Sequence, residues 1–282
     1  MAGQGDQLVE EIKRVLMAVD ENIKDNTALR YGVNLAHILN AEAEVIHVIE
    51  EAFVYPGWGA MVARRKEEIE RHHERMEAEV EKFRQKLNLD IGVRMRKGMS
   101  PAAEILRELH EENFDLLVVG SHGASAVMEF LLGGISSQIV HHAKKPVIVV
   151  KKMRNVRKML MCTAGSKCSF AAIRYSAGIA KAANADVTVL SVSPFDTSEA
   201  VSQAWEFVHA GAEILKEHGV AAKEFVRVGK PAEEILTEAR KQDFDLIVMG
   251  YLGTSAVADI LLGEVASKVM HHSRRPTLIF RE

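Results

Sequence analysis

The chain has few cysteines, no long apolar run and little net charge. Cys162 and Cys168 are the only cysteines among 282 residues, too few to stabilise a chain of this size by disulfide bonds, and their spacing fits no common zinc motif. No apolar stretch approaches the roughly 18 residues that a membrane-spanning helix needs. The first residues are polar and acidic, unlike a secretory signal. We therefore expect a cytoplasmic protein in a reducing compartment, without a membrane partner.

Several other function classes are disfavoured by what is missing. The formal net charge is −3, so the basic surface that nucleic-acid binding requires is not expected. The Walker motif of P-loop nucleotide-binding proteins, Gly-x4-Gly-Lys-Ser/Thr, is absent from the sequence. The sequence also lacks the signatures of adenylyl transferases and of pyrophosphate-releasing ATPases. The adjacent pairs that begin at His72, His141 and His271 do not have the spacing of helical zinc ligands. We predict no catalytic residue and no metal site.

The two halves of the chain repeat one another. Residues 113–120 return as residues 243–250, at an offset of 130 positions. Nearer the start the offset grows to 144 positions, because an insertion around residues 53–73 lengthens the first half. A period of this length indicates a duplicated domain rather than a solenoid of short repeats. We place the two domains at residues 1–152 and 153–282.

Each half is predicted to alternate strands with helices. Short apolar runs alternate with segments whose apolar residues recur at helical spacing, and Ser100 followed by Pro101 is typical of a helix start. This order predicts two tandem doubly wound α/β domains, flavodoxin-like or Rossmann-like, each with a five-stranded parallel sheet. In the first half the expected strands are residues 14–19, 44–49, 91–95, 116–119 and 147–150, and the expected helices are residues 28–39, 61–87, from 101 onward, and 134–142.

This fold class predicts where a ligand binds. In open α/β sheets the site lies beyond the carboxyl ends of the strands, where the strand order reverses. If the first and fourth strands flank that point, Asp20 and Gly120 meet there. Gly120 and Gly123 begin a glycine-rich segment, and after nine further residues Gly133 precedes a predicted helix. Free N–H groups at a helix start suit a phosphate. The pattern alone leaves open that these glycines only turn the chain and that Asp20 only caps a helix or turn.

The glycine segment resembles the nucleotide-binding motif of the universal stress protein family, in which Gly-x2-Gly-x9-Gly precedes a small polar residue. Residues 115–123 and 143–150 are similar to the family as well, and the resemblance extends over residues 12–152 and again over 156–282. It implies a tandem member whose halves pair through their last strands as an intramolecular pseudo-dimer. Two such chains are expected to associate as a homodimer.

The resemblance also implies an adenine-nucleotide pocket in the first half, for ATP or AMP, with or without Mg²⁺. The adenosine would lie against the ends of the first two strands, and the phosphates against the glycine segment. The residues implied are Ala18, Val19, Asp20, Val48, Val119, Gly120, Gly123, Gly133, Gly134, Ile135 and Ser136.

Both halves depart from the family pattern. The first has Gly134 where the family has serine or threonine, which removes a hydroxyl contact worth about 1.5–3 kcal/mol at a charged group, and Ala124 stands where many relatives have a basic residue. The second half has Glu264 at the small polar position and Ala164 opposite Asp20. A carboxylate at a helix start repels phosphate, so we expect the second half to bind ATP poorly or not at all.

The leading hypothesis is therefore a nucleotide-sensing stress-response protein that is not an enzyme. Two alternatives stay open: a nucleotide-free interaction or chaperone-like scaffold, and a slow ATPase assisted by Asp20. His122 lies in the glycine segment without a nucleophile in a recognisable motif, and we interpret it as a loop residue. Residues 55–59 are interpreted as a loop that could cover the nucleotide or bind a partner.

Overall fold

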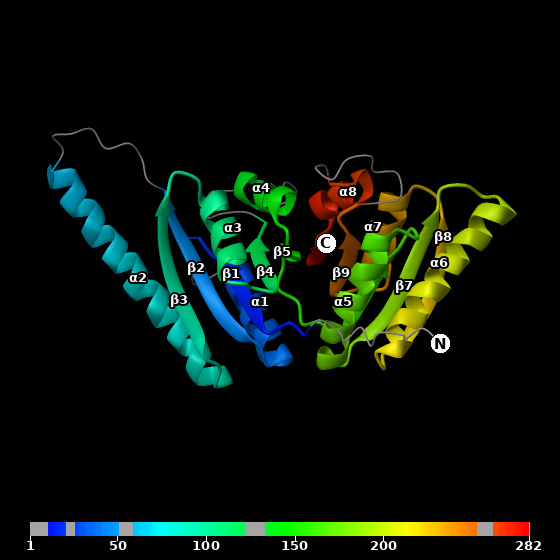
Figure 1. Cartoon of the computed structure of the whole chain (residues 1–282), viewed down its shortest axis with the longest axis horizontal. Coiled ribbons are helices and arrows are strands. Elements are labelled where there is room, and N and C mark those ends of the chain that lie inside the picture. The colour runs from blue at the N-terminus through cyan, green and yellow to red at the C-terminus, as the bar shows by residue number, and fades with distance from the viewer. Residues whose placement is uncertain (1–10, 21–25, 51–58, 122–132, 253–261, 282) are drawn as a thin grey trace, which may run out of the picture. The chain divides into compact units, whose positions relative to one another are not determined.

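The structure is a computed structural model, and it describes residues 11–20, 26–50, 59–121, 133–252 and 262–281 (Figure 1). The chain divides into two compact units. Arg14–Met153 form the first unit, and the second contains Arg154–Glu282. None of the helices in the described ranges combines the length and the apolar character needed to cross a membrane.

The first unit alternates strands and helices as expected (Figure 1). Its helix α3 begins after Ser100, whose hydroxyl accepts the N–H of Ala103, and has Pro101 at its start, as predicted. The elements are β1 (Arg14–Ala18), α1 (Thr27–Leu39), β2 (Glu42–Glu50), α2 (Gly59–Leu87), β3 (Ile91–Gly98), α3 (Pro101–Glu111), β4 (Leu116–Gly120), α4 (Gly134–His142) and β5 (Val147–Val150).

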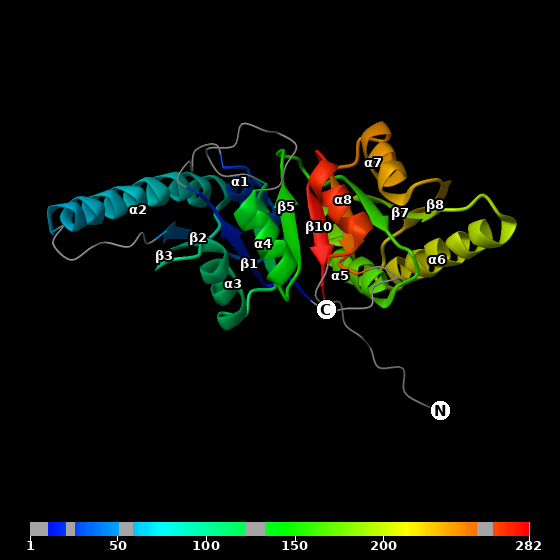
Figure 2. The same cartoon turned by 90° about the horizontal axis from the view of Figure 1, so that it is seen from above.

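All strand pairs of the first unit are parallel, in the order β3-β2-β1-β4-β5. Helices α3 and α4 pack against each other on one face of this sheet, and α1 lies with α2 on the other face (Figure 2). The central strands are therefore covered on both sides, which explains their continuous apolar runs. Leu16, Val118 and Ile148 are fully buried in this core.

The second unit repeats this architecture, with the strand order β10-β9-β6-β7-β8 and parallel pairs throughout. The five-stranded parallel sheet predicted for each half is thereby confirmed. The pairing of the two units stays a prediction. The elements are β6 (Lys158–Cys162), α5 (Lys167–Ala183), β7 (Asp186–Ser193), α6 (Ser198–Glu217), β8 (Ala222–Val228), α7 (Pro231–Lys241), β9 (Leu246–Gly250), α8 (Glu264–His272) and β10 (Thr277–Phe280).

Candidate functional site

The strand order of the first unit reverses between β1 and β4. From β1 the chain moves outward through β2 to β3, and it then returns to β4 on the other side of β1. Ala18 and Val119 are register partners at this point, and Gly120 follows directly. The observed order is not that of flavodoxin, in which the third strand lies next to the first. The first and fourth strands nevertheless flank the reversal, as the site hypothesis assumed.

Asp20 lies just beyond the end of β1, and its carboxylate contacts the start of α1. The side-chain N–H of Asn26 donates to Asp20 Oδ1 at 3.1 Å, while Asn26 Oδ1 accepts the N–H of Leu29 at 3.0 Å. The cap of α1 is therefore Asn26, not Asp20. This arrangement fixes the Asp20 carboxylate at the edge where the ligand is expected.

The end of β1 is also held to β2. The N–H of Val19 donates to the carbonyl of Ile46 at 3.0 Å. Val48 lies two residues further along β2, and both Val19 and Val48 are 8% exposed. The structure thus brings together, at one edge, the predicted adenosine-side residues of β1 and β2.

His47 lies among these residues and was not among the predicted site residues. Its side chain is 6% exposed, and Nδ1 lies 2.9 Å from the Val19 carbonyl oxygen. A carbonyl oxygen can only accept, so Nδ1 carries the proton and donates it. The available sequence signal was a histidine inside the otherwise apolar run of residues 45–49, directly before Val48.

The start of α4 is joined to the end of β4. Gly133 occupies the cap position, its N–H donates to the Ser121 carbonyl at 2.7 Å, and none of the described side chains caps the helix. The first turn of α4 carries no acidic residue. Among the residues that the structure describes, a Cβ added at Gly134 would meet no heavy atom within 4 Å, and the following Ile135 is 47% exposed. This helix start therefore has the open backbone and the positive dipole end that an anion needs.

Ser136 is held differently from what the family pattern implies. Its hydroxyl donates to the Gly120 carbonyl at 2.6 Å, and the residue is 8% exposed. In this structure the hydroxyl therefore fastens α4 to β4. The backbone of the first turn is left as the source of phosphate donors.

Lys151 adds a cation to the same edge. It directly follows Val150, whose carbonyl accepts the N–H of Ser121 at 3.0 Å. Burial lowers the pKa of Lys151 to about 8. A bound phosphate would favour the charged form of such a lysine, because opposite charges nearby raise a lysine pKa.

One predicted site residue, Gly123, lies outside the described residues. The same holds for His122 and Ala124, and for most of the loop expected at residues 55–59. The hypotheses on these residues stay predictions.

The corresponding helix start in the second unit carries a carboxylate. Glu264 is the first residue of α8, at the position that Gly134 has in α4. Lys268 Nζ lies 2.6 Å from Glu264 Oε1, and this hydrogen bond and its charge lower the pKa of Glu264. The side chain is therefore ionised at neutral pH, and its negative charge opposes a phosphate at this helix start.

Helix α5 also approaches the sheet where a ligand would lie. Helices α1 and α5 end at the equivalent left-handed residues Asn40 and Asn184, but α1 has 13 residues and α5 has 17, about one extra turn at its start. A Cβ added at Gly250 would lie 2.8 Å from the Ser169 nitrogen and 2.9 Å from the Cys168 carbonyl carbon. The first turn of α5 therefore packs directly on the end of β9.

No group of three or more histidine, cysteine or acidic residues is placed to hold a metal ion in the described part of the chain. His141 and His271 lie in the last turns of α4 and α8, and each places Nδ1 within 2.8 Å of a carbonyl oxygen four residues earlier. This agrees with their interpretation as helix C-terminal residues. His72 differs, because it is half-buried and its ring faces the ring of His47.

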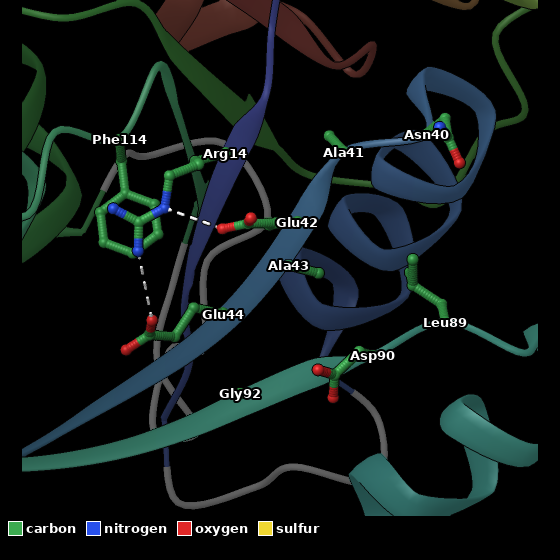
Figure 3. Close-up of a pocket in the computed structure, with 10 residues that line it drawn as sticks. All are labelled: Arg14, Asn40, Ala41, Glu42, Ala43, Glu44, Leu89, Asp90, Gly92 and Phe114. Carbon is green, nitrogen blue, oxygen red and sulfur yellow. Dashed lines mark ion pairs between the residues drawn. The ribbon is translucent and has the colours of Figure 1, made fainter.

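A cavity of about 410 Å³ lies at the opposite, amino end of the strands (Figure 3). The Arg14 guanidinium lies 4.4 Å from the centre of the Phe114 ring, and Arg14 Nε is 3.2 Å from Glu42 Oε2. The cavity contains none of the predicted site residues. Its lining is Arg14, Asn40, Ala41, Glu42, Ala43, Glu44, Leu89, Asp90, Gly92 and Phe114.

The strand order and the edge residues define the first unit as a doubly wound α/β domain with an anion-compatible switch point. A family model described as the universal stress protein family matches residues 11–151 and again residues 155–281. The chain belongs to the universal stress protein family and contains two copies of its domain.

Relatives with one copy of the domain and relatives of tandem length both match the chain. A universal stress protein of Methanocaldococcus jannaschii is 34% identical over 144 residues, which cover 45% of this chain and 82% of that protein. One of Mycolicibacterium smegmatis is 25% identical over 291 residues, 95% of this chain and 96% of the relative. The crystal structure of a universal stress protein from Archaeoglobus fulgidus covers 96% of this chain and 99% of its own, with a TM-score of 0.73 at 18% identity, and shows the same fold.

Proposed function

We propose that the first domain binds an adenine nucleotide, ATP or AMP, and that the protein acts as a nucleotide-sensing regulator in the stress response. Membership of the universal stress protein family supports the stress-related role. The nucleotide would lie across the switch point between β1 and β4. Its adenosine would contact Val19, Asp20 and Val48, and its phosphates would lie at the start of α4.

The observation that carries this proposal is the contrast between the two helix starts. Within the described part of the chain, Gly134 leaves the N-terminus of α4 open, without a capping side chain, and the first turn holds no acidic residue. The equivalent start of α8 carries the ionised Glu264. An open helix N-terminus attracts a phosphate, whereas a carboxylate already at that position repels it, so the first domain suits a phosphate and the second does not. We propose that the second domain binds ATP poorly or not at all.

The local packing supports the same division. In the first domain Asp20 lies beside the cap of α1, at the edge where a ribose hydroxyl is expected. In the second domain Ala164 has no such group, and the extra turn of α5 lies against Gly250. One nucleotide per chain is the stoichiometry that follows.

The proposed role is sensing rather than turnover. Binding would change the surface that a partner recognises, and hydrolysis would be slow at most. Both ATP and AMP remain candidates, because Gly134 supplies no hydroxyl for a further phosphate oxygen and Lys151 is the cation at this edge. Association of two tandem chains stays a prediction, which analytical ultracentrifugation tests.

The experiment is calorimetric titration of the purified chain with ATP and with AMP, each with and without Mg²⁺. We expect close to one nucleotide per chain, lost in Gly123→Val and unchanged in the matched variant Gly253→Val. Two nucleotides per chain would contradict the inactive second domain. The absence of both heat and thermal stabilisation at millimolar nucleotide would refute the proposal.

Two other functions are outcomes of the same experiment. A chain that binds no nucleotide would be an interaction or chaperone-like scaffold, the alternative that the missing hydroxyl at Gly134 favours. A slow ATPase would show metal-dependent phosphate release that disappears in Asp20→Ala. Phosphate release measured over hours with the wild-type chain and this variant separates an ATPase from a sensor.

A further inference from the structure

His47 joins three elements of the first unit. It lies on β2 directly before Val48, and its Nδ1–H donates to the Val19 carbonyl at the end of β1. The side chain is 6% exposed, so this hydrogen bond is made away from water. A buried carbonyl that loses its donor is destabilised by its own desolvation. His47 therefore supplies the donor that satisfies the Val19 carbonyl beside Asp20.

The third element is α2. The His47 and His72 rings meet edge to face, with their centroids 6.4 Å apart. On α2, His72 is followed at helical spacing by Met76 and Val80, which are 3% and 0% exposed. These three residues lie on one face of α2, and α2 contacts β3. Of the three, His72 is nearest to the start of α2, which follows β2 at the carboxyl edge.

The second unit fixes the same point without such a bridge. The residue equivalent to His47 is Ser191, which is buried at 3% exposure. At the end of β6 the hydroxyl of Thr163 lies 2.9 Å from Ser169 Oγ and accepts the N–H of Gly165 at 3.1 Å. The N–H of Thr163 also donates to the Leu190 carbonyl at 2.9 Å, as the N–H of Val19 does to Ile46, so both strand ends are held to the neighbouring strand. The units differ in the side chains that add to this bond: Ser169 from the first turn of α5 contacts Thr163 in the second unit, and His47 from β2 binds Val19 in the first.

We propose that His47 is a positioning residue that couples α2 to the adenosine side of the nucleotide site. This inference deepens the proposed function and rests on it. The hydrogen bond to Val19 sets the backbone beside Asp20, and the ring contact with His72 sets the orientation of the His47 ring. Nucleotide binding and the packing of the N-terminal half of α2 therefore stabilise each other, since coupling between two sites is reciprocal.

Two substitutions of His47 separate positioning from packing. His47→Phe keeps a ring against His72 but removes the donor to Val19, whereas His47→Asn keeps a donor and removes the ring. We expect His47→Phe to weaken ATP or AMP binding by about 2- to 10-fold, the range for one hydrogen bond. His47→Asn keeps the hydrogen bond and loses only the ring contact with His72, so it should weaken binding less than His47→Phe does. Ser191→Ala, the matched control in the second unit, should leave the affinity unchanged.

A second measurement tests whether nucleotide binding is coupled to α2. In the wild type, nucleotide should slow hydrogen exchange of the α2 amides around His72, and in His72→Ala this protection should be lost. Wild-type affinity in His47→Phe, equal weakening in His47→Phe and His47→Asn, or unchanged α2 protection in His72→Ala would each overturn the inference.

The ligand-free chain separates this inference from the proposed function. If the wild type binds no nucleotide, the proposed function fails by itself. His47 is then judged on exchange of the Val19 amide, whose N–H donates to Ile46. This exchange should be faster in His47→Phe than in His47→Asn. Equal exchange in the wild type and both variants would show that His47 does not position this backbone.

Discussion

Replacing Gly134 by serine should strengthen nucleotide binding. Gly134 is the first residue of α4, and a Cβ added there meets no heavy atom of the described residues within 4 Å, so a serine side chain displaces none of these neighbours. The change adds a hydroxyl at the helix start, where the phosphates are expected. The carboxyl edge and the rest of the first turn stay as they are.

The expected gain follows from two opposing terms. A hydrogen bond from a hydroxyl to a charged phosphate contributes roughly 1.5–3 kcal/mol. Ordering the serine side chain and imperfect geometry offset about 0.5–1.5 kcal/mol of this. At the midpoints of the two ranges the net gain is about 1.3 kcal/mol, which corresponds to roughly tenfold tighter binding.

The assay is calorimetric titration of Gly134→Ser with ATP at fixed ionic strength, beside the wild type and Gly134→Ala. The alanine variant adds the Cβ without the hydroxyl, so it controls for changes in helix stability. Gly134→Ser should bind about tenfold tighter than both. If wild-type binding is measurable and the serine and alanine variants have equal affinity, the phosphate does not lie at this helix start and the reasoning is refuted.

Three further predictions concern packing and titration. Gly250→Ala should destabilise the chain by about 1–3 kcal/mol in urea unfolding, because its Cβ would lie under 3 Å from the backbone of Ser169 and Cys168; unchanged stability would contradict this packing. The pKa of Lys151 is lowered to about 8 by burial, from 10.5. Since the unfolded chain then binds more protons, the free energy of unfolding of the wild type should rise from pH 8 toward 10.5. The Lys151→Met variant should show a flatter rise and should be more stable than the wild type at pH 7. Equal pH slopes for the two proteins in urea titrations would refute this prediction. Burial raises the pKa of the Cys162 thiol. Alkylation of the native chain at pH 8, measured by mass spectrometry, should therefore modify the half-buried Cys168 and spare Cys162. Equal labelling of the two cysteines would show that Cys162 is accessible.

The domain organisation could be predicted from sequence because its signals are local or repeated. The return of residues 113–120 as 243–250 indicates duplication directly. The continuous apolar run of β4 indicates a strand buried on both faces, and Ser100 with Pro101 indicates the start of α3. Such patterns depend on the period of a strand or helix and on cap chemistry, both of which act over a few neighbouring residues. For the same reason the sequence alone showed that the second half has Glu264 at the position that Gly134 has in the first half.

The contacts that shape the site were decided only by tertiary structure. In the sequence His47 is a single histidine within an apolar run. Its structural role depends on its contacts with Val19 and His72, which lie far from it along the chain. The extra turn of α5 affects the second domain's site because it lies against Gly250, at the end of β9. Local periodicity carries no information on which distant groups meet, because those contacts depend on strand order and on the packing of helices across the sheet. The sequence by itself therefore determined two doubly wound domains and the chemistry of each helix start, and the folded sheet decided which backbone and side-chain groups surround the predicted nucleotide.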